Sequence, residues 1–352
     1  MQWFGGLFGF EEDGLSYAEI KANFSLDAER RVLFSKVNGK RFVVGKFTTP
    51  SLHKLRQMGE RLGKRYWRPN SLAVEHVVTG DILPHHAHEC NAGATFQAAS
   101  QFNCLEFVTP YKEPEDGVTI YVNDPTQGPA CSIAAGPATV YRNYFAKVNG
   151  QEGQTRDQQL NNLDILSQLL ASEMGSVDGY SPPFEVRGGY TFSTVEGLMK
   201  LNAYLKKLSP EEKDTLRASI KIGMHSGVQV VFQDTPWSLI DYKQFVSQVF
   251  CSAISCAYSD DIPKELWKPL ATLVLEANYE ATLWAALINA ASLPDASKNV
   301  YLTLLGGGVF GNDEEWIHTA MQRALDKFRN VPLEVVIAHY SYDVPEMLGR
   351  LQ

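Results

Sequence analysis

The chain has 352 residues, of which 44% are hydrophobic and 20% are charged, and its formal net charge at pH 7 is −8. This composition is typical of a globular protein with a sizeable core. The acidic balance argues against a nucleic-acid-binding protein, which usually presents a basic face. A small anionic ligand stays open, because backbone N–H groups and helix N-termini bind phosphate without net positive charge.

The cysteines are widely spaced and form no CxxC pattern: Cys90, Cys104, Cys131, Cys251 and Cys256. They predict reduced thiols and argue against a zinc site, so we expect neither a metal nor a cofactor. We expect a cytoplasmic or nuclear location, with export as an effector left open. Residues 1–14 lack a basic segment and predict no signal peptide. Residues 266–291 are apolar but carry Lys268 and Glu276, which predicts a core helix and no membrane partner.

The first 70 residues contain short elements and are predicted to form an N-terminal elaboration packed on the core. Residues 16–19, Ser-Tyr-Ala-Glu, match a capping box and predict a short helix. Asn38 and Gly39 lie between two strand-like runs and predict a β-hairpin. A further helix is predicted to begin at Pro50.

Residues 71–352 are predicted to form one α/β domain with an insertion near residues 176–240. A strand is predicted over residues 72–82, where apolar and polar residues alternate. Residues 85–143 are dense in Gly, Pro, Asn and Gln and have little periodicity. We interpret them as a long functional loop that includes a strand at residues 118–122.

The second half of the chain ends in a strand–helix–strand pattern. This pattern predicts a partly parallel sheet covered by helices. The predicted elements are a helix over 154–174, a loop over 176–190, helices with capping boxes at Ser193 and Ser209, strands over 220–232 and 246–256, a helix over 266–291, a strand over 299–305, a helix from Asp313 and a strand over 333–340.

A glycine-rich turn follows the predicted strand at 299–305. Residues 302–312 read Leu-Thr-Leu-Leu-Gly-Gly-Gly-Val-Phe-Gly-Asn, and each glycine costs about 0.5–1 kcal/mol relative to alanine. A strand, a glycine turn and a helix offer a phosphate several backbone N–H groups and the positive end of the helix, with Asn312 as N-cap. The alternative is a packing turn whose glycines only provide clearance. The run is neither a P-loop nor a GxGxxG motif.

A second candidate loop begins with Gly80, Asp81 and Ile82. An aspartate at a strand end can accept a hydrogen bond from an exocyclic amine such as that of adenine. Asn91, which stands beside small residues, could reach a sugar hydroxyl. The alternative interpretations are that Asp81 caps a turn and that Asn91 adopts a left-handed conformation.

Taken together, these motifs resemble the macrodomain superfamily. The glycine turn, with Phe310 before its last glycine, is most similar to the poly(ADP-ribose) glycohydrolase branch. The stretches FQAASQFNCLEF and NDPTQGPA are similar to the MavL-type effector ADP-ribosylhydrolases, which remove ADP-ribose from modified ubiquitin. The resemblance covers roughly residues 72–145 and 245–340 and implies a macrodomain-like mixed sheet flanked by helices.

The resemblance also implies roles for individual residues. Asp81 would hold adenine, Asn91 and Gly93 the distal ribose, and the glycine turn the diphosphate, with Phe310 stacking on the ligand. The Gln-Glu-Glu signature of the glycohydrolase branch is replaced here by Gln-Phe-Asn, so trimming of a polymer is not predicted. The ligand-binding candidates are Asp81, Ile82, Asn91, Gly93, Gln101, Asn103, Gly306, Gly307, Gly308, Val309, Phe310, Gly311 and Asn312.

Three acids are candidates for catalysis, because cleavage at C1 of ADP-ribose develops oxocarbenium-like charge that a carboxylate can stabilise. Asp124 stands in a stiff polar loop after the predicted strand at 118–122 and is preferred. Glu106 has apolar neighbours, which would raise its pKa, although it could be a satisfied buried carboxylate. Asp116 precedes a glycine and could be a turn residue.

Other polar groups have simpler interpretations. His85, His86 and His88 are predicted to lie in a surface loop, and Glu276 and Glu280 on a solvated helix face. Residues 251–253 are equally compatible with a ligand-lining turn and a core strand.

We therefore predict an ADP-ribosylhydrolase that binds ADP-ribose and cleaves an ADP-ribosyl linkage on a modified protein, with ubiquitin among the candidate carriers. The alternative is a non-catalytic ADP-ribose reader. A nucleotide-sugar or NAD-processing enzyme is a third interpretation.

Overall fold

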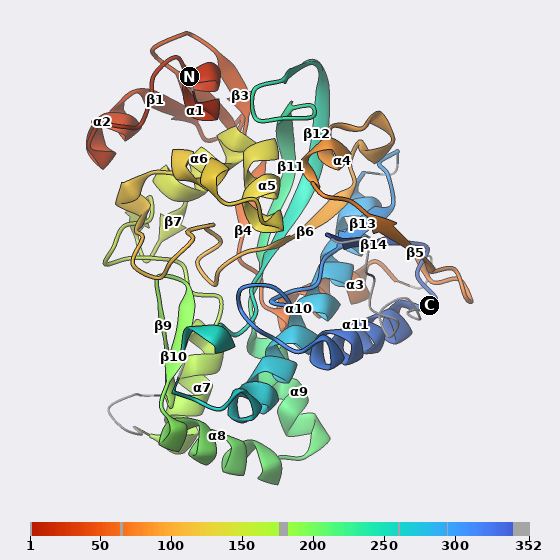
Figure 1. Ribbon diagram of the computed structural model, residues 1–352. Coiled ribbons are helices and arrows are strands. Elements are labelled where there is room, and N and C mark those ends of the chain that lie inside the picture. Colours follow the sequence, from red (N-terminus) through yellow and green to blue (C-terminus); the bar gives the residue numbers. More distant parts are fainter. Residues whose placement is uncertain (1, 64–65, 176–181, 260, 294, 341–352) are drawn as a thin grey trace.

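The computed structural model describes residues 2–63, 66–175, 182–259, 261–293 and 295–340. Its centre is a seven-stranded sheet in the order β4-β11-β12-β6-β13-β14-β5, with helices on both faces (Figure 1). The predicted mixed α/β architecture is therefore confirmed. The strands are β4 (Lys46–Thr48), β11 (Gly223–Phe232), β12 (Leu239–Cys251), β6 (Thr95–Ala99), β13 (Asn299–Leu302), β14 (Glu334–His339) and β5 (Ala73–Val78).

The sheet is partly parallel, as the strand–helix–strand pattern predicts. The five strands from β12 to β5 run parallel, whereas β4, β11 and β12 pair antiparallel. Helix α11 (Glu314–Phe328) connects β13 to β14. The carboxyl ends of the parallel strands therefore meet at one edge, which is where open α/β sheets bind ligands.

Two helix layers cover the sheet. One face packs against α3 (Leu52–Arg61), α10 (Lys264–Ser292) and α11, and the other against α4 (Leu83–Ala87), α5 (Gln127–Ala134) and α6 (Gly136–Tyr144). Helix α10 is buried along most of its length, so the prediction of a core helix is confirmed. Within the described ranges, no helix is long and apolar enough to cross a membrane.

The N-terminal residues form a small aromatic-rich unit that packs beside α6. It comprises α1 (Trp3–Phe8), α2 (Tyr17–Ala22) and the antiparallel strands β1 (Phe24–Asp27), β2 (Val32–Ser35) and β3 (Arg41–Val43). The Ser16 capping box and the Asn38-Gly39 hairpin are both confirmed. The following strand, β4, joins the central sheet, so these first residues also contribute to the core.

The prediction of one long loop over residues 85–143 is wrong. This segment holds the central strand β6 and the helices α5 and α6, with 3-10 turns η2 (Glu89–Asn91), η3 (Pro114–Asp116) and η4 (Thr119–Asn123). The strand predicted over 118–122 is in fact η4. Helices α5 and α6 are buried almost all round, so they lack the apolar and polar faces that give helical periodicity.

The middle of the chain departs from prediction at two places. Helix α7 (Asp164–Met174) begins later than expected, after the short strands β7 (Lys147–Val148) and β8 (Gln151–Glu152). The predicted loop contains the hairpin of β9 (Phe184–Arg187) and β10 (Tyr190–Ser193), whose Gly-Gly turn is a hairpin signal that we missed. Residues 176–181 of that loop lie outside the described residues.

The helix ends of this segment give one confirmation and one correction. The N-cap of α8 (Val195–Lys207) is Thr194, because Ser193 belongs to β10. The Ser209 capping box of α9 (Pro210–Ser219) is confirmed.

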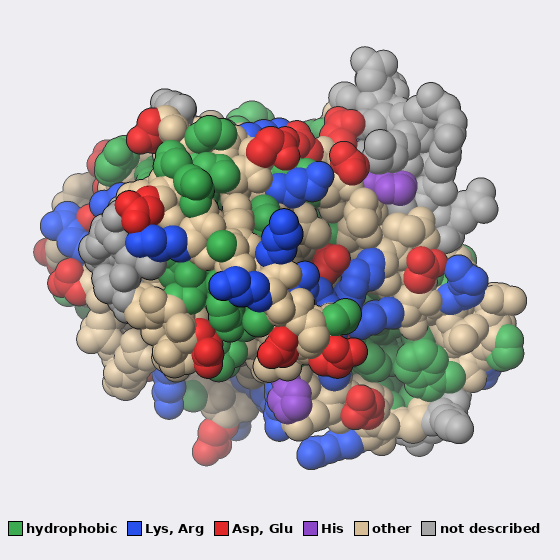
Figure 2. Space-filling model, turned by 90° about the horizontal axis from the view of Figure 1, so that it is seen from below, with side chains coloured by type: hydrophobic (Ala, Val, Ile, Leu, Met, Phe, Trp, Pro, Cys, Tyr) green, Lys and Arg blue, Asp and Glu red, His purple; other side chains and the backbone are tan. Residues whose placement is uncertain are grey.

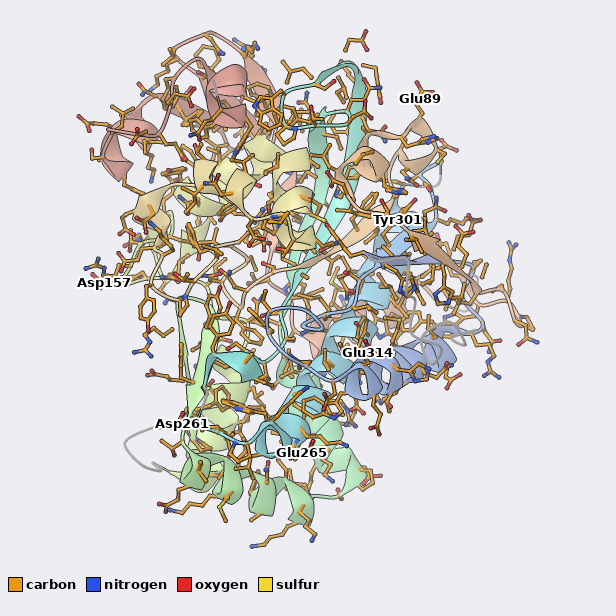
Figure 3. All side chains as sticks on the ribbon, in the orientation of Figure 1. Glu89, Asp157, Asp261, Glu265, Tyr301 and Glu314 are labelled. Carbon is orange, nitrogen blue, oxygen red and sulfur yellow. The ribbon has the colours of Figure 1, made fainter. Side chains whose placement is uncertain are left out.

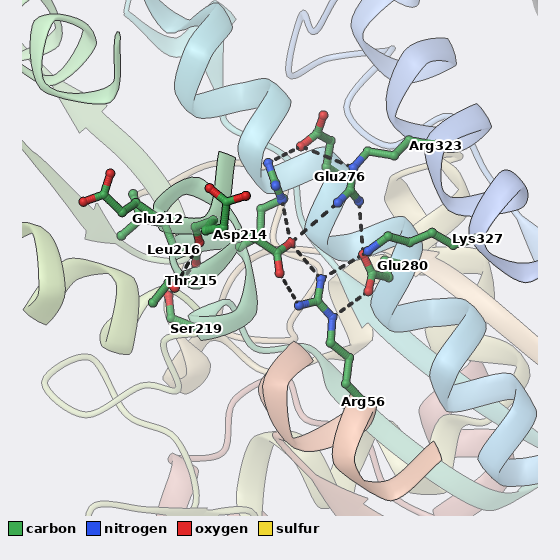
Figure 4. A network of polar contacts seen from close by, with 12 residues as sticks. Arg56, Glu212, Asp214, Thr215, Leu216, Ser219, Glu276, Glu280, Arg323 and Lys327 are labelled. Carbon is green, nitrogen blue, oxygen red and sulfur yellow. Dashed lines mark hydrogen bonds and ion pairs between the residues drawn. The ribbon is translucent and has the colours of Figure 1, made fainter. Parts of the chain in front are cut away.

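Glu276 and Glu280 do not lie on a solvated helix face. The side chain of Glu280 is 1% exposed and accepts hydrogen bonds from Arg56 and Lys327 (Figure 4). Glu276 pairs with Arg217 at 2.9 Å. This ion-pair network ties α3, α9, α10 and α11 together. The two carboxylates therefore contact basic side chains of other helices, where contact with water was expected.

Candidate ligand-binding site

A cavity of about 440 Å³ opens at the edge where the parallel strands end. Its wall combines the last residues of β6, β12 and β14 with two loops that follow the sheet. The lining residues are Ala99, Ser100, Pro125, Thr126, Gln127, Gly128, Cys251, Ala253, Thr303, Leu304, Leu305, Gly306, Gly307, Gly308, Val309, Phe310, Glu314, Ile317, Ala338, His339 and Tyr340. The structure therefore places the glycine turn in the wall of a cavity.

Glycine is present at the positions of this turn for different physical reasons. Gly306 and Gly311 both have φ of +72°, and a Cβ on Gly306 would come within 2.5 Å of Ala253. A Cβ on Gly308 would meet no atom within 4 Å. The backbone N–H groups of Gly308, Val309 and Phe310 donate to no acceptor in the described chain. Clearance thus explains part of the run, and the rest of it presents free donors to the cavity.

Asn312 closes the turn and is not the N-cap of α11. Its side-chain amide donates to the Ile254 carbonyl at 2.7 Å, and its backbone N–H donates to the Gly306 carbonyl at 2.9 Å. The N-cap is Asp313. The aspartate takes this position because Asn312 is used to hold the two ends of the turn together.

Phe310 lines the cavity but packs mainly into the protein. Its side chain is 9% exposed, and its ring lies at 5.3 Å from that of Tyr190 and 5.7 Å from that of Tyr258. Val309, in contrast, is 63% exposed. The stacking role of Phe310 stays a prediction, and the aromatic contacts explain how its ring is held against the wall.

The second donor-rich loop is the start of α5, which the sequence motifs did not single out as an anion site. Thr126 is the N-cap, but its side chain makes no capping hydrogen bond. The N–H groups of Gln127 and Gly128 belong to the first turn, where a helix offers no internal acceptor. The Gln127 side chain accepts from the Ala99 N–H at 2.8 Å and so fixes this helix end at the tip of β6. The unusual Pro-Thr-Gln-Gly-Pro run was the available signal.

Asp81 lies after β5 at the same edge of the sheet. One carboxylate oxygen accepts from the Leu83 N–H at 2.8 Å, so the turn-capping interpretation holds for that oxygen. Burial raises the pKa of the cavity-lining Tyr340, with smaller contributions from Cys131 and Asp81. Asp81 itself is not part of the described wall. Ile82 is fully buried. The adenine role of Asp81 stays a prediction.

Asn91 and Gly93 lie at the opposite end of β6 and do not line the cavity. The Asn91 side chain donates to the Tyr301 hydroxyl at 3.0 Å and accepts from Asn299 at 2.8 Å. Gly93 has φ of +79°, and a Cβ there would come within 2.3 Å of Ala296. Both residues thus hold the entry into the strand, and we leave them out of the proposed site.

Gln101 and Asn103 are buried and also do not line the cavity. Gln101 donates to the Phe107 carbonyl and accepts from the Phe107 N–H at 3.1 Å. Asn103 accepts from the Leu105 N–H at 3.0 Å. Their positions support the chain on either side of Glu106.

Glu106 lies directly behind the wall and is 4% exposed. A Cβ on the cavity-lining Gly128 would come within 2.3 Å of its Oε2, so only glycine fits there. Burial raises the pKa of Glu106 well above its usual range, although the Arg142 charge opposes the shift. Its Oε1 has no hydrogen-bond partner in the described chain. The carboxyl group therefore holds its proton more tightly than an ordinary glutamate.

Asp124 and Asp116 occupy very different places. Asp124 directly precedes the cavity-lining Pro125 and accepts from the Thr126 N–H at 2.9 Å. Its negative charge contributes to the raised pKa of Glu106, less than burial does. Asp116 is exposed and accepts from the Glu113 N–H at 2.9 Å. This geometry agrees with the interpretation of Asp116 as a turn residue, and we leave Asp116 out of the proposed site.

The surface-loop prediction is wrong for His85 and His86, which lie in the short helix α4, whereas the exposed His88 follows this helix. His86, in α4, is fully buried and its ring stacks on Phe96 at 3.8 Å. Burial lowers the pKa of His86 to about 4. Across the residues that the structure describes, no group of three or more His, Cys, Asp or Glu side chains could hold a metal ion. All five cysteines are free.

Few charged side chains face the cavity. Its described wall contains no lysine or arginine, and Glu314 at the start of α11 is its one carboxylate (Figure 3). Elsewhere, acidic and basic side chains are interspersed on the face seen in Figure 2. Recognition of an anion in this cavity would therefore depend on backbone N–H groups, as the glycine turn predicts.

No protein-family model and no curated protein matches the chain. Among solved structures, poly(ADP-ribose) glycohydrolase from Deinococcus radiodurans in complex with ADP-ribose matches with a TM-score of 0.43 and 12% identity, over 86% of this chain and 90% of that chain. The glycohydrolase from Thermomonospora curvata matches with a TM-score of 0.39 and 13% identity, over 95% and 93%. At this identity and score the likeness is distant, so the chemistry has to be argued from this chain's own residues.

Proposed function

We propose that the protein binds ADP-ribose in this cavity and hydrolyses an ADP-ribosyl linkage on a modified protein. The observation that carries the proposal is the pair of donor-rich backbone segments in one wall, at residues 308–310 and at the start of α5. Backbone N–H groups and a helix N-terminus together favour a phosphate-bearing ligand. The motif resemblance to the macrodomain superfamily supplies the identity of that ligand.

Two acids beside the cavity support a hydrolase. The pKa of Glu106 is raised by burial, whereas Asp124 lies at the edge of the cavity and acts on Glu106 as a negative charge. A pair of carboxyl groups in such different environments can divide the roles of acid and base. Water would add to C1 and give a proton to Asp124, while the departing acceptor atom would keep the bonding electrons and take the Glu106 proton.

One observation favours the non-catalytic reader as the second candidate. Neither Glu106 nor Asp124 is part of the cavity wall itself, and one Asp124 oxygen is used by the Thr126 N–H. A reader needs only the donor loops. The two functions therefore share a binding site and differ in whether either acid reaches the bond at C1.

Two measurements on the full chain test the proposal. Calorimetry with ADP-ribose measures binding, and release of ADP-ribose from mono-ADP-ribosylated proteins, including modified ubiquitin, measures turnover. Binding with turnover supports the hydrolase. Binding without turnover on any modified protein identifies a reader, and absence of binding removes both functions.

A further inference from the structure

Tyr121, in η4, contacts the backbone of both candidate acids beside the cavity. Its hydroxyl accepts from the Glu106 N–H at 3.0 Å, and its carbonyl accepts from the Asp124 N–H at 3.2 Å. The side chain is 1% exposed, and its ring packs edge-on against Phe107 with the centroids 5.5 Å apart. One buried residue thus links the two chain segments that carry Glu106 and Asp124.

The N-terminal unit holds the beginning of η4. The Glu12 carboxylate, which follows α1, accepts from the Thr119 N–H and from the Thr119 hydroxyl, both at 2.6 Å. Its other oxygen accepts from the Tyr144 hydroxyl at 2.6 Å. The Trp3 indole N–H donates to the Thr119 carbonyl at 3.1 Å. Every polar group of Thr119 is therefore bonded to the N-terminal unit, two residues before Tyr121.

A shared hydrophobic cluster surrounds these hydrogen bonds. Leu105 and Phe107, on either side of Glu106, belong to the same buried cluster as Trp3 and Tyr121. A buried donor or acceptor that loses its partner is costly, so the hydrogen bonds inside this cluster are strongly favoured to stay formed. The N-terminal unit is therefore connected to the chain at Glu106 by packing as well as by polar contacts.

We propose that Tyr121 is a positioning residue, and that the N-terminal unit acts through it to hold the backbone of the two candidate acids in place beside the cavity. Glu12 and Trp3 fix Thr119, and η4 carries that constraint to the hydroxyl and the carbonyl of Tyr121. The effect on turnover rests on the proposed hydrolase function, whereas the effect on the two backbone segments does not. The described part of the N-terminal unit contributes no residue to the cavity wall, so it acts without touching the ligand.

Amide hydrogen exchange of the ¹⁵N-labelled full chain tests the positioning role without a ligand. Tyr121→Phe removes the acceptor of the Glu106 N–H and keeps the ring, so exchange at Glu106 should become about tenfold faster than in the parent. Tyr242→Phe is the matched control, because its hydroxyl donates to the Ala87 carbonyl at 2.5 Å and it stands near the end of β12 away from the cavity. It should leave exchange at Glu106 unchanged.

Glu12→Ala tests the contribution of the N-terminal unit, because it removes the acceptor of both Thr119 donors. Exchange at Glu106 and at Asp124 should become faster than in the parent. Glu19→Ala is the matched control, since Glu19 is an exposed acid whose contacts stay within the capping box of α2, and it should change neither rate.

Turnover and affinity give the second measurement. In Tyr121→Phe and Glu12→Ala, kcat for release of ADP-ribose from a modified protein should fall by about 10- to 100-fold, because small displacements of reacting groups are costly. Affinity for ADP-ribose in calorimetry should stay unchanged, since the Gln127 side chain holds the start of α5 to β6 independently of η4. If Glu12→Ala does not fold, Trp3→Phe removes the other contact to Thr119 and allows the same comparison.

Two results would overturn the positioning role. These are unchanged exchange at Glu106 in Tyr121→Phe, and exchange that becomes equally faster throughout the chain, which would indicate a loss of global stability. Unchanged kcat in both variants would overturn the part in turnover. A parent that binds ADP-ribose but releases none would remove the proposed hydrolase function, while the exchange rates would still decide the role of Tyr121.

Discussion

Gly308→Val is the substitution that separates ligand binding from folding most cleanly. A Cβ at this position meets no atom within 4 Å, and Gly308 is not among the glycines with positive φ. Surface changes of this kind usually alter stability by no more than about 0.5 kcal/mol. The valine would stand among the free N–H groups of residues 308–310, which line the cavity. The same side chain is therefore harmless to the fold and obstructive to a bound diphosphate.

The expected loss follows from the donors that become blocked. A hydrogen bond to a charged group contributes about 1.5–3 kcal/mol, so losing one or two should cost roughly 2–4 kcal/mol, or about 30- to 1,000-fold in ADP-ribose affinity. Calorimetry measures the affinity, and a urea titration without ligand measures stability. Gly307→Val should also weaken binding, but its Cβ would lie 3.1 Å from Ile317, so some loss of stability is expected.

Gly6→Val is the matched control, because its Cβ also meets no atom within 4 Å and Gly6 lies in α1, away from the cavity. It should bind ADP-ribose as the parent does. A Gly308→Val protein that keeps both its stability and its ADP-ribose affinity would show that the diphosphate does not lie on this turn.

Three further outcomes are expected. If Asp81 accepts from the adenine amine, the inosine analogue of ADP-ribose should bind about 1–3 kcal/mol more weakly in calorimetry, and equal affinities would remove this role. Asp124→Ala should lower kcat by about 10²–10⁴-fold with little change in affinity, whereas full turnover in Asp124→Ala with loss in Glu106→Gln would assign the main role to Glu106. Gly128→Ala should cost about 1–3 kcal/mol in a urea titration, because its Cβ would overlap the Ala99 carbonyl and Glu106; unchanged stability would contradict that packing.

The parts of the fold that were predictable depend on signals between residues close in sequence. The capping boxes at Ser16 and Ser209, the Asn38-Gly39 turn and the C-terminal strand–helix–strand unit are all of this kind. Helices α5 and α6 gave no such signal, because burial on every side removes the contrast between apolar and polar positions. This is why residues 85–143 read as a loop.

The site was harder to predict, because a short motif does not show at which end of a strand it lies. Asn91 followed by small residues looks the same at either end of β6, and only the sheet shows that it lies at the end away from the cavity. The burial of Glu106 depends on Gly128, which the fold brings against its carboxylate. The glycine turn was recognisable because strand, turn and helix are consecutive in sequence.

The pKa of Glu280 also depends on residues that are distant in sequence. This dependence leads to a prediction about the stability of the fold at low pH. Burial alone would raise the pKa of Glu280, but hydrogen bonds from Arg56 and Lys327 outweigh it and lower the pKa to about 2. Because the folded pKa lies below that of the unfolded chain, the stabilisation is complete above about pH 4.5 and disappears as pH falls toward 2. Burial lowers the pKa of Lys327, which offsets part of the gain, so we expect about 2–3 kcal/mol.

Glu280→Gln should therefore lower the free energy of unfolding by about 2–3 kcal/mol at pH 7, and the difference from the parent should shrink below pH 4.5. Urea titrations at pH 7, 4 and 2.5 measure it. Asp326→Asn is the control, since the Asp326 side chain is 50% exposed beside Arg329 and an exposed pair contributes at most about 1 kcal/mol. A gap between Glu280→Gln and the parent that is the same at all three pH values would mean that the variant loses packing and not charge, and that the network in Figure 4 does not stabilise the fold through ionised Glu280.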